Sequence, residues 1–138
     1  MKVSELEGAL LDYWVAMADE SWTWAHELFP TMTLDPKFKG VKLVLFADEE
    51  VERCLLVPRN AMRQELQHFA PSLSWEHGGP LIARHRIGVM PRGGQTWGAW
   101  LVDDMEPSGI AGSPLVAAMR ALVASKFGEL LEEVPNDR

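Results

Sequence analysis

The sequence predicts a single α+β domain in which an N-terminal and a C-terminal helix pack on a small, mainly antiparallel sheet. Amphipathic segments with helix-start signals open and close the chain, and the short alternating segments between them show no βαβ rhythm. The length of 138 residues suits one domain with its own core. We therefore expect residues 1–138 to form one domain, with an acidic tail at 129–138 that frays.

The first helix is predicted from its start signal and its periodicity. Ser4 and Glu7 have the spacing of a capping box, in which each side chain binds a free backbone N–H of the first turn. Gly8 would then lie inside the helix, at a cost of about 1 kcal/mol relative to Ala. Apolar residues at helical spacing predict a buried stripe formed by Leu6, Leu10, Tyr13, Trp14 and Met17.

The next part of the chain predicts one hairpin between two short helices. Ser21 favours a short helix that ends before Pro30 and contains Trp22 and Trp24, although the two-residue spacing of these tryptophans also suits a strand. Residues 41–47 alternate and predict a strand, and residues 53–57 predict its returning partner. Asn60 is expected to cap a short helix whose apolar face carries Met62, Leu66 and Phe69.

Residues 70–80 are predicted to form a loop. The run Gly78-Gly79-Pro80 is poorly suited to the interior of a helix or a strand. Residues 81–86 are ambiguous, and Pro80 would favour a helical turn there if it occupied a first helical position.

The last third of the chain predicts a hairpin followed by a capped helix. Residues 87–90 and 97–102 are expected to pair as antiparallel strands. Ser113 caps the final helix, Pro114 takes its first position, and Gly128 ends it. The apolar stripe of this helix consists of Leu115, Met119, Leu122 and Val123.

Composition excludes several classes of protein. Cys54 is the only cysteine, so the chain has no internal disulfide and no four-thiolate metal site, which indicates a reducing compartment. The first residues lack the apolar run of a signal peptide, and no 18-residue apolar stretch spans a membrane. A net charge of −7 disfavours binding to nucleic-acid phosphates.

Three blocks of sequence carry a family resemblance. They are VSELEGALLD at residues 3–12, PSLSW followed by GGPLI within residues 71–82, and GSPLVAAMR running on to VASKFG within residues 112–128. In this order they resemble the phage NinX-like family of unknown function. The resemblance implies a phage or prophage protein that works in the cytoplasm of an infected bacterium. It implies no reaction and no catalytic residues, and residues 20–69 lie outside it.

The best candidate for a binding site is the segment from Trp75 to Arg86. Adjacent glycines expose backbone N–H groups to an anion, a tryptophan stacks on a base or sugar, and arginines pair with phosphate or carboxylate. The opposing interpretation makes the glycines a tight turn and Trp75 a core residue. The candidate residues are Trp75, His77, Gly78, Gly79, Arg84 and Arg86.

No other pattern predicts catalysis, a metal or a cofactor. His26, His68, His77 and His85 have no metal-ligand spacing, and we expect them to be structural or surface residues. Cys54 lies in an apolar run and is expected in the core. The paired carboxylates fall in predicted turns or in the tail, where a solvated role is expected.

These observations favour a non-catalytic accessory protein that binds a host or phage protein, with a symmetric homodimer as a further expectation. Of the six tryptophans, Trp14, Trp97 and Trp100 are assigned to the core, and Trp22, Trp24 and Trp75 to a binding surface. The main alternative is an enzyme or binding module for a small phosphorylated or nucleotide ligand, with Trp75, His77 and Arg84 in one pocket. Another is an acidic surface that imitates DNA.

Overall fold

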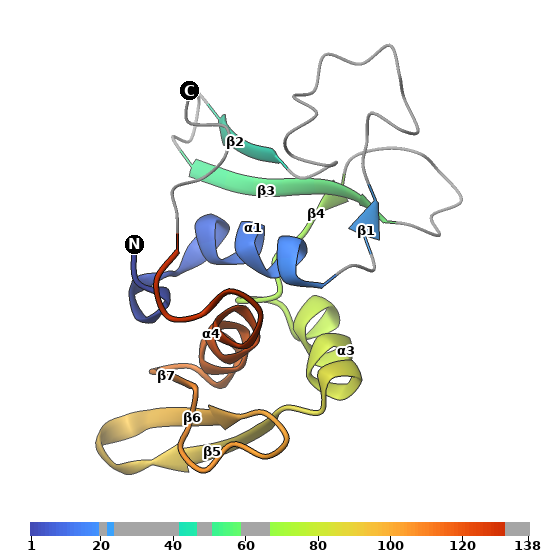
Figure 1. Ribbon diagram of the computed structural model, residues 1–138. Helices are drawn as coiled ribbons and strands as arrows, with labels where there is room; N and C mark the ends of the chain where they lie inside the picture. Colours follow the sequence, from blue (N-terminus) through green and yellow to red (C-terminus); the bar gives the residue numbers. More distant parts are fainter. Residues whose placement is uncertain (20–21, 24–41, 47–50, 59–66, 132–138) are drawn as a thin grey trace.

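The described residues form three α-helices and two antiparallel sheets, arranged as in Figure 1. The computed structural model describes residues 1–19, 22–23, 42–46, 51–58 and 67–131. The helices are α1 (Gly8–Ala18), α3 (Trp75–His85) and α4 (Pro114–Phe127), with 3-10 turns η1 (Val3–Glu5) and η3 (Gly93–Gln95).

The first sheet has the order β1-β3-β2, and β4 also pairs with β3. Its strands are β1 (Trp22–Thr23), β2 (Lys42–Phe46), β3 (Val51–Pro58) and β4 (Gln67–His68). The second sheet has the order β5-β6-β7. Its strands are β5 (Gly88–Arg92), β6 (Thr96–Trp100) and β7 (Gly109–Ala111).

Two helices form the centre of the molecule. In Figure 1, α1 lies beneath β2 and β3, and α4 lies between α1 and the second sheet, with α3 at its side. The core where these layers meet is made of aliphatic and aromatic side chains, the largest fully buried ones being Tyr13, Phe69, Leu6, Leu11, Leu81, Met119 and Leu122. This arrangement confirms the predicted α+β domain with both terminal helices packed on antiparallel sheet.

Helix α4 forms as its local signals predict. The Ser113 hydroxyl accepts the Val116 N–H at 3.4 Å, Pro114 takes the first helical position, and Gly128 ends the helix with φ +86°. The predicted stripe is buried along its length. Both predicted hairpins are confirmed as well, because β2 pairs with β3 and β5 pairs with β6. Cys54 is fully buried, as expected.

The start of the first helix differs from the prediction. Ser4 lies in η1, and α1 begins at Gly8 with Glu7 as a cap residue that makes no side-chain cap bond. Gly8 adopts φ +62°, a conformation that glycine takes without steric cost. The capping box is therefore wrong, and Gly8 belongs to the helix start rather than to its interior. Tyr13 and Trp14 are buried as predicted.

The predicted loop at residues 70–80 is wrong in its second half. A turn is followed by α3, which begins at Trp75 and continues through Gly78, Gly79 and Pro80. Tertiary packing overrides the weak helix propensity of this run. At Gly78 the helix packs closely against Pro71 in the preceding turn and against Leu115 of α4. The neighbouring residues 81–85 complete α3.

Two further differences concern short strands. Residues 22–23 do not start a helix as predicted. They form β1, which pairs with the end of β3. The second sheet also contains β7, which begins at Gly109 and which the sequence did not predict. The remainder of the helix expected before Pro30, and the cap at Asn60 with Met62 and Leu66, lie outside the described residues. No described helix has the length and apolarity needed to cross a membrane.

Candidate functional site on helix α3

His77 lies on the inner side of α3, where its ring is used by the fold. Its Nδ1 accepts the backbone N–H of Ala70 at 3.0 Å, and the ring stacks on Phe69 with centroids 5.9 Å apart. A ring nitrogen that accepts this bond carries no proton, so the neutral ring places its proton on Nε2. His77 therefore fixes the turn that leads into α3.

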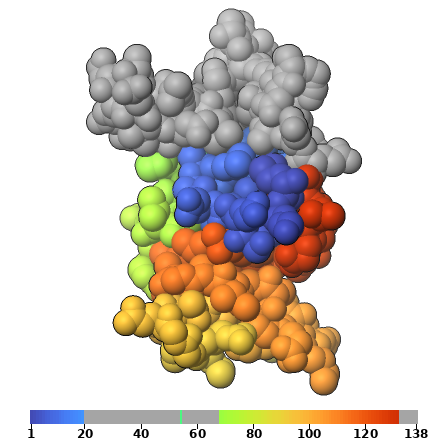
Figure 2. Space-filling view, turned by 90° about the vertical axis from the view of Figure 1, so that its left-hand side faces the viewer, coloured from blue at the N-terminus to red at the C-terminus, as the bar shows by residue number. Residues whose placement is uncertain are grey.

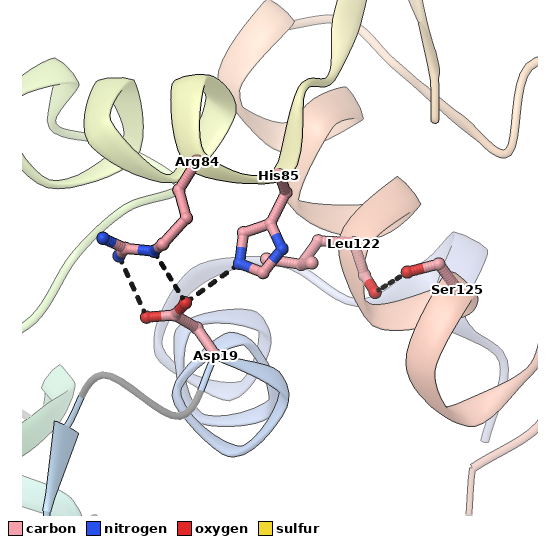
Figure 3. Close-up of polar contacts among 5 residues, drawn as sticks. All are labelled: Asp19, Arg84, His85, Leu122 and Ser125. Atoms are coloured by element: carbon pink, nitrogen blue, oxygen red, sulfur yellow. Dashed lines mark hydrogen bonds and ion pairs between the residues drawn. The ribbon is translucent and has the colours of Figure 1, made fainter. Parts of the chain in front are cut away.

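Arg84 and His85 bind one carboxylate, that of Asp19 at the end of α1 (Figure 3). Arg84 donates from Nε and from a terminal nitrogen to the two Asp19 oxygens, each at 3.2 Å. The Nε2 atom of His85 lies 2.9 Å from Oδ1 of the same residue. The Asp19 side chain is only 3% exposed, whereas that of Arg84 is 49% exposed. The predicted anion partner of Arg84 is thus supplied by the chain itself, and it joins α1 to α3.

The two adjacent glycines have opposite surroundings. A Cβ atom at Gly78 would lie 2.6 Å from the Pro71 carbonyl oxygen and 2.6 Å from a methyl carbon of Leu115. A Cβ atom at Gly79 would meet nothing within 4 Å. Gly78 is therefore required for the close approach of α3 to its neighbours, and Gly79 leaves bare helix backbone open to solvent.

Trp75 is the exposed member of the candidate set. Trp75 is 57% exposed, and Leu73 in the preceding turn is 75% exposed. Trp75 and Gly79 are four residues apart and so lie on one side of the helix. Arg86 is exposed too and ends α3 in the left-handed conformation, with φ +56°. The interpretation of Trp75 as a core residue is wrong.

The structure does not bring the residues of the enzyme alternative together. Trp75 begins α3 and Arg84 lies in its last turn, about 13 Å along the axis at 1.5 Å per residue, and His77 turns inward between them. Two hollows lined by described residues lie elsewhere, one beside Arg120 and one beside Trp14. Within the described ranges, no three His, Cys, Asp or Glu residues gather as metal ligands do.

The turn before α3 is held by a buried carboxyl group that sequence reasoning missed. Asp12 is 2% exposed, and one of its oxygens accepts the Ser72 N–H at 2.9 Å. Burial raises the pKa of Asp12 from 3.8 to about 6, against a smaller lowering by its hydrogen bonds with Ser72. Burial and the Asp12 charge also raise the pKa of the Cys54 thiol well above its usual range, which makes it a poor nucleophile.

Comparison with known proteins extends the sequence resemblance. A family model described as bacteriophage P22 NinX matches residues 2–126. This match includes residues 20–69, which the three sequence blocks left unplaced. A comparison with curated proteins gave no match.

Proposed function

The chain belongs to the bacteriophage P22 NinX family, and we propose that this phage accessory protein binds another protein without catalysing a reaction. The partner is a host or phage protein, and the interaction takes place in the cytoplasm of the infected bacterium. The contact is made by the outer side of α3 together with the turn before it, which we define as the α3 surface: Leu73, Trp75 and Gly79.

One observation carries the proposal, namely that His77 and Arg84 of the predicted site are engaged within the fold, whereas its tryptophan is exposed. His77 and Arg84, the groups that acid–base chemistry or anion binding would need, are engaged by Ala70 and Asp19. Trp75 is more than half exposed beside them. Burying a tryptophan against a partner removes a large apolar area from water, and tryptophan is enriched among residues that dominate binding energy.

Gly79 supports the same surface from its backbone. Because no side chain covers the helix there, a partner could approach the main chain next to the Trp75 ring. An aromatic residue beside a bare stretch of helix makes a shallow apolar surface that suits a protein side chain. The partner is thus expected to insert an apolar residue next to Trp75.

The competing proposal is a binding module for a small phosphorylated or nucleotide ligand on this same side of α3. It is supported by the exposure of both Trp75 and Arg86, which would stack on a base and pair with a phosphate. Arg86 lies farther along the helix from Trp75 than Arg84 does, so the ligand would have to span that distance. Against it, the guanidinium of Arg84 already holds both oxygens of Asp19. A single exposed arginine would have to hold the phosphate.

A capture experiment with matched variants tests the two proposals. The wild type, Trp75→Ala and Leu130→Ala would be used as baits in lysate of phage-infected cells. Leu130 is 71% exposed and lies far along the chain from α3, so it controls for the loss of an exposed apolar side chain. We expect one protein to be recovered by the wild type and by Leu130→Ala, and to be lost with Trp75→Ala.

Two results would contradict protein binding through this surface. One is a wild type that recovers nothing above background, and the other is equal recovery of the partner by Trp75→Ala. Titration of the wild type with nucleotides, followed by tryptophan fluorescence, addresses the competing proposal. A saturable change that is absent in Arg86→Ala would favour the small ligand.

A further inference from the structure

The second sheet presents an apolar row on the face turned away from α4. In the strand register, Met90 pairs with Gly98, and Gly98 pairs with Ile110, so these three residues form one row across β5, β6 and β7. Met90 is 57% exposed and Ile110 is 44% exposed. Their neighbours Ala99 and Ala111 are buried and face the core.

Trp100 and Arg92 belong to this same face. A Cβ atom at Gly98 would lie 3.0 Å from a ring carbon of Trp100 and 3.0 Å from Cδ of Arg92, so both side chains cover the glycine. Trp97 and Trp100 are three residues apart on one strand and therefore point to opposite faces. Trp97 packs on the core as predicted, but the assignment of Trp100 to the core is wrong.

An antiparallel sheet with one free face usually has polar residues there. In Figure 1, α4 lies against one face of this sheet, and Figure 2 shows residues 88–111 at one end of the molecule. The described residues include nine large apolar side chains that are exposed. Four of them lie on this sheet or in the loop after β6: Met90, Val102, Met105 and Ile110.

We propose that this outer sheet face (Met90, Arg92, Gly98, Trp100 and Ile110) is the contact surface of a symmetric homodimer. The argument for a second copy is charge complementarity within the face. Arg92 pairs with Thr96 in the strand register and so lies at one end of β6, whereas the acidic loop after Trp100 begins at the other end.

A two-fold axis along the row from Met90 to Ile110 makes the face complementary to itself. It stacks the sheets with their strands antiparallel, so the Arg92 end of one copy covers the acidic end of the other. Within that loop, Asp104 is engaged, because its carboxylate accepts the Leu101 N–H and the Ser108 hydroxyl. Asp103 and Glu106 are exposed and would face Arg92 of the second copy. The guanidinium of that Arg92 would also reach Trp100 of the first copy for a cation–π contact.

The net charge of the whole chain opposes self-association, so the dimer depends on local attraction between unlike charges. Two copies at −7 repel each other at long range, so an acidic chain that self-associates needs a local cation opposite a local acid. Three short strands provide only part of the roughly 800 Å² per partner that a stable interface buries. The loop with Val102 and Met105 must supply the rest, and we expect a dimer whose population rises with concentration.

Sedimentation velocity of the full chain over a concentration series tests the proposal. The wild type should pass from monomer to dimer, and Met90→Glu should raise the dissociation constant on the order of a hundredfold, because the symmetry buries the new charge twice. Leu73→Glu, which places the same charge on the α3 surface, should dimerise like the wild type. A wild type that stays monomeric at millimolar concentration, or a Met90→Glu variant that dimerises equally well, overturns the proposal.

Two further variants guard against misfolding and test the charges. Ile110→Glu repeats the test from another strand, with circular dichroism to confirm that each variant is folded. Arg92→Glu should weaken the dimer about tenfold, and adding Asp103→Arg and Glu106→Arg should restore it. Failure of that restoration contradicts the two-fold arrangement. The result is independent of the proposed function, because Trp75→Ala should abolish capture of the partner and leave the dimer unchanged.

Discussion

The inner and outer sides of α3 contain similar residues in very different surroundings. On the inner side, His77 binds a backbone N–H and Gly78 touches the Pro71 carbonyl. On the outer side, Trp75 and Gly79 meet solvent. Neighbouring residues on a helix point about 100° apart, so a motif of adjacent residues is divided between packing and surface. The short run from Trp75 to Gly79 therefore contains both a structural glycine and an exposed one.

The largest expected effect comes from Gly78→Ala. The added methyl group would overlap the Pro71 carbonyl oxygen, a backbone atom that cannot move away without shifting the turn. We expect a loss of about 3 kcal/mol in the free energy of unfolding, the upper part of the range for overpacked sites. Urea unfolding measures it. A variant as stable as the wild type would show that α3 does not depend on this contact.

Asp12→Asn tests the buried carboxyl group that holds the turn before α3. The folded pKa of Asp12, about 6, lies above its ordinary 3.8, so the neutral form stabilises the fold, and this stability is lost as pH rises through 6. Asn keeps an oxygen for the Ser72 N–H and carries no charge. At pH 8 the variant should be more stable than the wild type by at most about 3 kcal/mol, and the difference should vanish near pH 4.

A difference between Asp12→Asn and wild type that does not change with pH would contradict this account. The matched control is Glu76→Gln, which removes a carboxylate from an exposed position on α3. A change in stability shared by both variants would come from the loss of a carboxylate in general and not from the buried position of Asp12. Chemical unfolding at pH 4, 6 and 8 gives all three curves.

Asp19→Ala separates α3 from the end of α1. It removes the shared acceptor of Arg84 and His85. The expected loss is about 1 to 2 kcal/mol, since the Arg84 side chain is half exposed and its ion pair is weakened by water. Arg86→Asn, which changes an exposed residue with a left-handed backbone that Asn tolerates, should have almost no effect. A double-mutant cycle with Arg84→Ala isolates the pair, and zero coupling would refute the link.

These contrasts also explain how far the sequence could predict the protein. Helix α4 was predictable because its signals are local: Ser113 and Pro114 begin it, and Gly128 ends it. Helix α3 was missed because its stability depends on distant partners, including Leu115 beside Gly78. The segment proposed as a site could be singled out from the sequence, but the structural roles of its residues could not. Nothing near Asp19 in sequence indicates that it binds Arg84 and His85, which lie 65 and 66 positions away.

The smallest expected effect belongs to Gly79→Ala, and it has the opposite sign to that of Gly78→Ala. The new methyl group meets no atom within 4 Å, and Ala favours an exposed helix interior over Gly by up to about 1 kcal/mol. The variant should therefore unfold at a slightly higher urea concentration. If a partner approaches the bare backbone beside Trp75, the same methyl group should weaken its capture. A gain in stability together with a loss of binding would show that Gly79 serves the partner and not the fold. A glycine needed only for packing, as Gly78 is, cannot give both results.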